Sequence, residues 1–446
     1  MNIDCEWFQA QLEPYINSDR WLIAYSGGLD SSVLLRLMVE IRNSSDSLPH
    51  LEAIHVNHGL NARADQWQLH CIQRCIEYQV PLTVVGADVS NQGLGLEAAA
   101  RQARYKQLEK VLASNDLLIM AHHLDDQIET FFLRLLRGAG VDGLAAMPSL
   151  RDLGDGQIFR PLLTVPRIEL ERFAIQSDLR WVEDDSNRDT DFDRNFLRSE
   201  VLPIVQQRWP GYRKTVARAV NHMADSRQRI SGLSATKLKI CESKSRGQTV
   251  LLLDLLLDYD NLLVASILRS WLSREQFSMP RSEQLKEFLK QLRHKLDATS
   301  PILHGQGYEI RHFQHKLYLL SPAVDFDTTQ VLMVEVGQAL SIDGVGTVKI
   351  ETPHSEAHDL ALQFRIEFRK GGERCQPNGR KHSQSLKKLM QEYLIEPWWR
   401  ARVPLIYLED RLLAVGDYWI CEIKESDVEL PRLKVSWTRS QLNNQN

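Results

Sequence analysis

A short run of glycines, serines and one aspartate has the composition of a phosphate-binding loop. The run Ser26-Gly27-Gly28-Leu29-Asp30-Ser31 follows an apolar segment, 21–25, and precedes a helical pattern, 31–41. Backbone N–H groups at a helix N-terminus point outward, and the helix dipole adds partial positive charge, so this position suits an anion. We predict that these six residues bind phosphates. The alternative is a plain strand-to-helix turn in which Asp30 caps the helix.

The residue types in this loop suit different aspects of phosphate binding. Gly27 and Gly28 let the backbone turn tightly and approach a phosphate closely. Ser26 and Ser31 supply hydroxyl donors, and Asp30 is the predicted ligand of a magnesium ion held against the same phosphates. The loop lacks the G-x-x-x-x-G-K-[ST] spacing. No lysine therefore reaches a terminal phosphate, as one does in enzymes that transfer the γ-phosphoryl group.

Histidines and carboxylates gather in a second run, 121–130, at the carboxyl end of a predicted strand, 117–120. Ligands collect at such strand ends in open α/β sheets. Asp125 and Asp126 lie four and three residues before Glu129, so on a helix the three carboxylates share one face. They suit a metal or an ammonium group, and the alternative is an acidic helix N-terminus favoured by the dipole. The adjacent His122 and His123 lack further ligands at helical spacing, so no zinc site is expected.

Four predicted strands must position these two runs. Apolar segments at 21–25, 51–56, 82–85 and 117–120 alternate with helical patterns at 31–41, 65–78, 96–113 and 125–137. This alternation predicts an α/β fold, with a doubly wound, mostly parallel sheet that has helices on both faces. Residues 219–291 are mostly helix-like, with an amphipathic helix at 281–296. From residue 300 short strands prevail (308–310, 316–320, 347–350), with one helix around 386–393.

We therefore predict three domains. A catalytic domain occupies 1–215, a mainly helical middle domain 216–350, and a small α+β domain 351–446. Helix breakers near 208–212 and polar residues near 352–359 mark the candidate linkers.

The composition of the 446 residues is that of a globular protein, with 43% hydrophobic and 25% charged residues. No apolar run approaches the roughly 18 residues of a membrane span, and acids stand near the N-terminus where a signal peptide would be basic. These features predict a soluble, cytoplasmic protein that does not bind a membrane. The six cysteines include no Cys-x-x-Cys, so we expect buried or idle thiols, with neither a disulfide framework nor a zinc ribbon.

Two basic islands interrupt a chain whose net charge is −4. Residues 194–218 hold six basic residues against one acid, and residues 365–402 hold ten against four. Such islands suit localised phosphate binding, and solvated helix faces are the alternative. We predict RNA contacts from both islands, namely from Arg194, Arg198, Lys387, Lys388 and Arg400.

The run Ser26 to Ser31 resembles the S-G-G-x-D-S motif of the PP-loop ATP pyrophosphatase superfamily. That resemblance implies that the loop holds the β- and γ-phosphates of ATP, and that the α-phosphate is the electrophile that activates an oxygen as an adenylate. The second run, extended through Arg137-Gly138, resembles the A-H-H-x-D-D-Q-x-E-T-x-x-x-x-x-x-R-G stretch of the tRNA(Ile)-lysidine synthetases. Further motifs resemble the same family at 96–105, 160–163, 181–187, 194–203, 387–392 and 397–405.

Membership of that family would imply a defined reaction. ATP, with Mg2+, adenylates the 2-oxo group of the wobble cytidine in a CAU-anticodon tRNA(Ile), and free L-lysine then displaces AMP through its ε-amine. The resemblance assigns Arg101 to the charge on the α-phosphate. It makes Asp125, Asp126 and Glu129 the candidates for binding the lysine ammonium and removing its proton.

Three other functions fit the residues less well. A tRNA thiolase would need sulfur-carrying cysteines, and Cys71 and Cys75 have no further partner nearby. A small-molecule amidotransferase would leave the basic islands unexplained, and an inactive tRNA-binding protein is disfavoured by the intact Ser26 to Ser31 loop. The sequence leaves open a homodimer, the docking of the tRNA, the identity of the general base and the role of residues 220–350.

Overall fold

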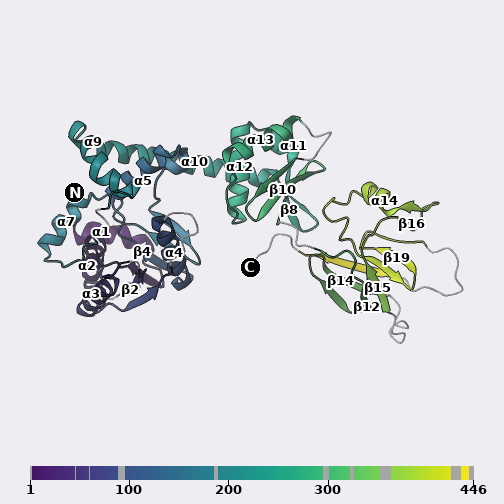
Figure 1. The fold of residues 1–446 in the computed structure, drawn as a ribbon, viewed down its shortest axis with the longest axis horizontal. Helices are drawn as coiled ribbons and strands as arrows, with labels where there is room; N and C mark the ends of the chain where they lie inside the picture. Colours follow the sequence, from purple (N-terminus) through teal and green to yellow (C-terminus); the bar gives the residue numbers. More distant parts are fainter. Residues whose placement is uncertain are drawn as a thin grey trace. The chain divides into compact units, whose positions relative to one another are not determined.

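The computed structural model describes residues 3–45, 47–59, 61–88, 96–184, 189–294, 301–321, 326–351, 363–422 and 433–440. The chain divides into two compact units, Met1–Ile230 and Ser231–Asn446. Figure 1 shows the elements of both units along the chain. Within the described residues, no helix combines the length and the apolar character needed to cross a membrane.

The first unit is built on a six-stranded sheet with the strand order β3-β2-β1-β4-β6-β5. All neighbouring pairs are parallel except β5 with β6. The strands are β1 (Arg20–Ala24), β2 (His50–Asn57), β3 (Leu82–Gly86), β4 (Asp116–Ile119), β5 (Leu150–Leu153) and β6 (Gly156–Phe159). The predicted mostly parallel sheet is confirmed, and the β5–β6 hairpin adds an edge that the sequence analysis did not predict.

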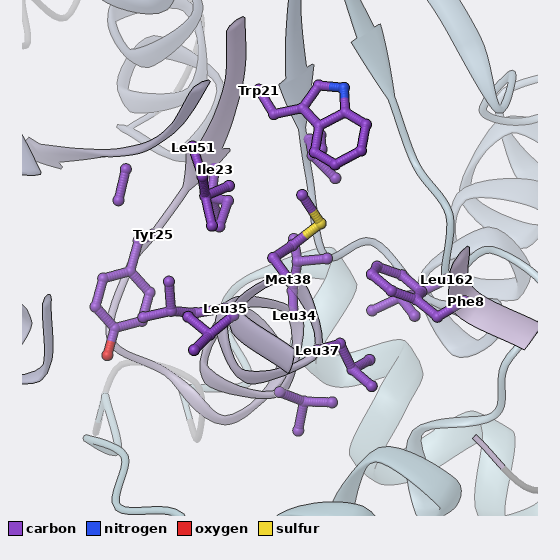
Figure 2. Packing of buried hydrophobic residues seen from close by; sticks show 14 of the residues in the cluster. Phe8, Trp21, Ile23, Tyr25, Leu34, Leu35, Leu37, Met38, Leu51 and Leu162 are labelled. Atoms are coloured by element: carbon purple, nitrogen blue, oxygen red, sulfur yellow. The ribbon is translucent and has the colours of Figure 1, made fainter. Parts of the chain in front are cut away.

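Strand β1 has side chains buried on both faces of the sheet, as expected for a central parallel strand. Trp21 and Ile23 face a core shared with the helices α1 (Cys5–Leu12), α2 (Leu29–Ser44), α3 (Ala64–Glu77) and α7 (Arg167–Gln176). Leu22 faces the opposite core, against α4 (Leu96–Val111). Helices therefore cover both faces. Figure 2 shows Trp21 and Ile23 gathered with Leu34, Leu35 and Met38 of α2.

The strand order places a topological switch point beside β1. The chain passes from β1 to β2 and β3 on one side, and then returns to β4 on the other side of β1. Crossover helices leave in opposite directions at such a point, so a crevice opens outside the carboxyl ends of the two strands. The phosphate loop follows β1, and the second run follows β4. The fold therefore brings both candidate motifs to the same edge of the sheet.

The remaining helices of the first unit are η1 (Glu13–Tyr15), α5 (Leu124–Leu136), α6 (Val141–Leu144), α8 (Asp193–Phe196), the π-helical turn η3 (Leu197–Val201), α9 (Leu202–Arg208) and α10 (Tyr212–Cys241). Leu124 and Ile128 of α5 share a core with Leu197, Leu202 and Tyr212. The helix break predicted at 208–212 separates α9 from α10. The second unit takes the C-terminal end of α10.

The second unit contains two antiparallel parts, each with its own sheet. The middle part carries the strand order β7-β8-β11-β10-β9. Its elements are β7 (Glu242–Ser245), β8 (Gln248–Leu252), α11 (Leu253–Leu257), α12 (Asn261–Arg274), α13 (Ser282–His294), β9 (Ile302–Gly305), β10 (Tyr308–Phe313) and β11 (Lys316–Leu320). The predicted helices are therefore joined by a five-stranded sheet. The last two residues of the predicted helix 281–296 lie outside the described residues.

The C-terminal part has a five-stranded sheet of order β12-β15-β18-β19-β20, a three-stranded sheet of order β13-β14-β21, and the pair β16-β17. Its elements are β12 (Leu332–Glu335), β13 (Ala339–Ile342), β14 (Gly346–Glu351), β15 (Gln363–Glu367), β16 (Arg374–Cys375), β17 (Gln384–Ser385), α14 (Leu386–Glu392), β18 (Leu405–Leu408), β19 (Arg411–Val415), β20 (Trp419–Ile420) and β21 (Lys434–Arg439). The predicted linker at 352–359 lies outside the described residues.

One expectation about the cysteines was wrong. Cys375 and Cys421 form a disulfide, with their Cα atoms 6.0 Å apart, although they lie 46 residues apart in the sequence. A backbone bridge between Pro377 and Cys421 brings the two segments together. The pairing depends on this tertiary contact, and the spacing of the cysteines carries no sign of it. The other four cysteines are free, and three of them are buried.

Candidate active site

The phosphate loop has an open helix N-terminus. Helix α2 begins at Leu29, and within the described residues no side chain caps it. Gly27 has a φ of +81°, and a Cβ at this position would lie 2.9 Å from the Cys71 Sγ, so both conformation and space require glycine. The Ser31 hydroxyl donates to the Gly28 carbonyl oxygen at 3.0 Å and lies 3.0 Å from the Ser26 hydroxyl. The loop is thus ordered by its own side chains, whose hydroxyls also accept from the backbone N–H groups of Ser26, at 3.3 Å, and Gly28, at 3.4 Å.

Asp30 lies in the first turn of α2 and has a cationic neighbour at each oxygen. Its buried Oδ1 has no hydrogen-bond partner and lies 3.8 Å from the Arg167 Nε, and its Oδ2 lies 3.6 Å from the His123 Nε2. Among the described residues, no three His, Cys, Asp or Glu side chains gather into a metal site. A magnesium ion needs few protein ligands, because it takes substrate phosphates and water for the rest. A carboxylate oxygen beside a phosphate loop that accepts no hydrogen bond fits this requirement.

His123 joins the two motifs. It is the N-cap of α5. Its ring Nδ1 accepts from the Asp126 backbone N–H, and its backbone N–H donates to the Asp126 Oδ2 at 3.0 Å. Burial would lower the pKa of His123, but the Asp126 and Asp30 carboxylates raise it above the usual value. Burial would likewise raise the pKa of Asp126, but His123 and Arg194 lower it to about 2. Because Nδ1 accepts a hydrogen bond in the N-cap interaction, the ring proton of His123 on Nε2 is available to the carboxylates of Asp30 and Asp126.

His122, the next residue, has the opposite electrostatic environment. The buried Arg160 donates from Nε to the His122 Nδ1 at 3.2 Å, and from Nη1 to the Pro148 carbonyl oxygen. An arginine only donates hydrogen bonds, so Nδ1 must accept and the ring proton lies on Nε2. Burial, with Arg160, Arg101 and Arg194 nearby, lowers the pKa of His122 to about 3 despite Asp126. The ring is therefore neutral and offers an N–H donor at its outer nitrogen.

Arginines meet all three candidate carboxylates of α5. Glu129 accepts from the Arg194 Nε at 2.6 Å and from the Arg198 Nε at 2.6 Å, and its side chain is only 1% exposed. Asp126 accepts from the Arg194 Nη2 at 2.8 Å. Asp125 accepts from the Arg213 Nε at 2.7 Å and from the backbone N–H of Arg167 at 2.8 Å.

These contacts give the first basic island a role within the site. Arg194 and Arg198, which we predicted to contact RNA, are partners of the acids on α5. Arg213 belongs to the same arrangement, and the sequence analysis did not single it out. Only its place in the basic island 194–218 hinted at it. His122 and Arg160 were also not predicted as site residues, although each lies in one of the motifs that resemble the family.

Arg101 lies on α4, which packs on the face of the sheet opposite to α2. It is exposed, its guanidinium stands 5.1 Å from the centroid of the Tyr105 ring, and it lowers the pKa of His122. Arg101, Arg160 and Arg194 thus all lie near the His122 ring. The part of the 181–187 motif made of Asp185, Ser186 and Asn187 lies outside the described residues.

The predicted RNA contacts of the second island lie in the C-terminal part. Lys387 and Lys388 are exposed on α14, whereas Arg400 is half-buried and donates from Nε to the Ile395 carbonyl oxygen at 2.9 Å. The neighbouring tryptophans belong to the protein interior. Trp399 is buried, and Trp398 packs edge-on against Tyr318. Of the three predicted contacts, the two lysines are therefore the exposed ones.

Comparison with known proteins decides the family. Residues 5–205 match the PP-loop domain, residues 251–318 the TilS substrate binding domain, and residues 364–437 the TilS substrate C-terminal domain. The tRNA(Ile)-lysidine synthase of Coxiella burnetii is 39% identical over 411 residues, which are 91% of this chain and 90% of that protein. The chain belongs to the tRNA(Ile)-lysidine synthase family.

Other relatives in the lysidine synthase family agree over nearly the full length. The protein of Serratia proteamaculans is 38% identical, covering 96% of this chain and 98% of its own. That of Legionella pneumophila (strain Paris) is 35% identical, covering 90% and 92%. The PP-loop match spans the phosphate loop, the acids of α5 and the arginines of α8 and η3. It confirms the predicted ATP-binding domain.

Proposed function

We propose that this chain ligates free L-lysine to C2 of the wobble cytidine in the CAU-anticodon tRNA(Ile), forming lysidine with release of AMP and pyrophosphate. The observation that carries the proposal is the meeting of the two motifs at one sheet edge, where the His123 Nε2 lies 3.6 Å from the Asp30 carboxylate. ATP and the amine nucleophile need to be neighbours, because the adenylate formed in the first step is consumed in the second. The three predicted domains, 1–215, 216–350 and 351–446, are part of the proposal.

In the first step the cytosine O2 attacks the α-phosphorus of ATP. The O2–phosphorus bond forms, the bond to the β-phosphate oxygen breaks, and pyrophosphate leaves into the loop. The backbone amides of Gly27, Leu29 and Ser31 would hold the departing phosphates at the positive end of α2, together with those of Ser26 and Gly28 once these release the Ser31 and Ser26 hydroxyls. A magnesium ion on Asp30 would neutralise charge on these phosphates. Arg101 and the Nε2–H of His122 face the α-phosphate oxygens, where charge develops.

In the second step the lysine ε-amine attacks C2 and the bond from C2 to the adenylate oxygen breaks, so AMP leaves. Only the unprotonated amine is a nucleophile, so a carboxylate must first bind the ammonium and receive its proton. Asp125, Asp126 and Glu129 are the proposed acids for lysine. All three carboxylates accept hydrogen bonds, but the Glu129 side chain is 1% exposed whereas those of Asp125 and Asp126 are each 14% exposed, so we assign Glu129 to positioning. Asp125 and Asp126 then form the edge that faces lysine.

The tRNA body needs contacts away from the reacting base. Lys387 and Lys388 are exposed on α14, and together with Arg400 they form the proposed contact of the C-terminal domain. Proteins recognise RNA helices mainly through their shape and their phosphates. Exposed lysines on a protein helix can contact those phosphates. The guanidinium groups of Arg194 and Arg198 are paired with the α5 acids. These arginines therefore affect RNA binding indirectly, by positioning the site. We propose that the enzyme acts in the cytoplasm.

A labelling experiment tests the function. The protein is incubated with ATP, magnesium, radiolabelled lysine and a panel of tRNA transcripts. We expect label only in the tRNA(Ile) that carries the CAU anticodon. A transcript whose wobble cytidine is replaced by uridine is the matched control and should stay unlabelled. Absence of label from every RNA, or label in RNAs without that cytidine, would overturn the proposal.

A further inference from the structure

The basic island 194–218 splits into two groups with different surroundings. Arg194, Arg198 and Arg213 donate to the carboxylates of α5. Three further basic residues of the island are exposed and make no ion pair with any residue that the structure describes: Arg208, Lys214 and Arg218. Half of the island is therefore neutralised inside the site, and half faces solvent.

An exposed tryptophan stands among the free cations. Trp209 is 60% exposed at the end of α9, and the Arg208 guanidinium lies 5.6 Å from the centroid of its ring. Its backbone is fixed from both sides, because its N–H donates to the Val205 carbonyl at 2.8 Å and its carbonyl accepts from the Tyr212 N–H at 3.0 Å. A large aromatic face on a fixed backbone, flanked by a guanidinium, is a surface on which a nucleobase stacks.

The neighbouring chain ties this surface to the active-site helix. Tyr212, three residues after Trp209, is buried in the core that contains Leu124 and Ile128 of α5. Arg213 then pairs with Asp125 at 2.7 Å. A nucleic acid that places its reacting base beside Asp125 therefore has its adjoining nucleotides close to the start of α10.

The charge of the surface selects a polyanion. Residues 201–224 contain no Asp or Glu, so no carboxylate of this segment competes with the free cations. Lys214 and Arg218 are four residues apart on α10 and lie on one side of it. Phosphate contacts supply affinity without sequence preference, whereas an aromatic face needs a base that is free to unstack. The combination fits a single-stranded loop better than a stem.

We propose that Arg208, Trp209, Lys214 and Arg218, the 208–218 surface, bind the anticodon loop of the substrate tRNA, with one unpaired base stacked on Trp209. This inference rests on the proposed function and adds to it the part of the RNA that the first unit reads. The cations hold the phosphates of the loop while the cytidine enters the crevice.

The first test replaces the aromatic face. Binding of an anticodon stem-loop RNA to the full-length protein is measured for Trp209→Ala, Trp209→Phe and Ile204→Ala. Ile204 is the matched control, since it is 68% exposed on the same helix α9. We expect Trp209→Ala to lose about 5- to 150-fold in affinity, the range of one base–aromatic stack, and Trp209→Phe to retain most of it. Ile204→Ala should bind as the wild type does.

The second test concerns the cations. The triple variant Arg208→Ala, Lys214→Ala, Arg218→Ala should flatten the slope of log affinity against log salt by up to about two to three units for the same RNA. Arg172→Ala, which removes an exposed arginine of α7 that pairs with Glu169, should leave the slope unchanged. Wild-type affinity and slope in the Trp209 and triple variants overturn the proposal. So does an equal loss, in Trp209→Ala, of affinity for a blunt RNA duplex.

Different results would contradict the proposed function and the role of the 208–218 surface. If the wild-type protein makes no lysidine, the proposed function is wrong, whatever the binding data. If it makes lysidine while the Trp209 and triple variants bind the stem-loop normally, only the 208–218 surface is wrong.

Discussion

Replacing Glu129 by glutamine should lower the stability of the first unit and leave the KM for lysine nearly unchanged. The amide keeps the shape of the side chain and removes its charge. Arg194 then keeps the Asp126 Oδ1 at 2.8 Å, but Arg198 is left with a contact to Asp126 of 3.8 Å. Two guanidinium groups would then share one carboxylate in a partly buried site.

The expected loss follows from the burial of the pair. Breaking a buried ion pair by removing one partner costs about 3–5 kcal/mol, because the other charge stays desolvated. Glu129 is 1% exposed, but Arg198 is 37% exposed, so water compensates part of the loss. We expect a loss of about 3 kcal/mol. For a unit of this size that corresponds to a fall in Tm of about 6–12 °C.

Thermal unfolding of the full-length variant by circular dichroism checks this value, with Glu171→Gln as the control. Glu171 pairs with Arg167 at 2.9 Å on α7, and both side chains are more than a third exposed, so its loss should cost about 0–1 kcal/mol. The KM for lysine is measured in parallel. A Glu129→Gln protein that melts like the wild type but shows a raised KM would refute the reasoning and return Glu129 to the lysine site.

Four further outcomes are expected. Asp30→Ala should abolish AMP transfer to tRNA and spare tRNA binding, because a magnesium ligand acts on the phosphates; an equal loss of tRNA affinity would remove that assignment. Asp125→Asn and Asp126→Asn should each raise the KM for lysine while pyrophosphate release persists, and failure at pyrophosphate release would move the residue to the ATP side. Lys387→Ala with Lys388→Ala should weaken full-length tRNA binding and flatten its salt slope by about two units without affecting an anticodon stem-loop; an unchanged slope shows that these lysines do not touch RNA. Asp126, with a pKa of about 2 against an ordinary 3.8, stabilises the fold fully above pH 3.8 and loses that contribution, about 2 kcal/mol, as the pH falls towards 2. Acid unfolding of Asp126→Asn should therefore lack this step, and an identical acid profile would contradict the charge arrangement.

Much of the first unit was predictable, because its signals are local. The strand predicted at 21–25 is β1, Arg20–Ala24, and the helix predicted at 125–137 is α5, Leu124–Leu136. Glycine in a left-handed turn, as at Gly27, and acids in the first turn of a helix follow from rules that span a few residues. The β5–β6 hairpin was missed, since its two strands are short and only partly apolar.

The charge partners were not predictable from the chain. Glu129 meets Arg198 across 69 residues, and His122 meets Arg160 across 38. The basic island 194–218 reads as one RNA-binding segment in the sequence, but folding divides it into cations that neutralise the α5 acids and cations that stay in solvent. The disulfide between Cys375 and Cys421 has the same origin in a distant backbone contact.

The sequence by itself therefore determined most strands of the parallel sheet and the helices between them, the phosphate loop and the family. These depend on periodicity, turn chemistry and short motifs, which act over a few residues. The tertiary structure alone decided which carboxylates face arginines, which histidine is neutral and which basic residues stay free. Those properties depend on burial and on distances between side chains far apart in the chain, and both are set only when the sheet order brings the ends of β1 and β4 together.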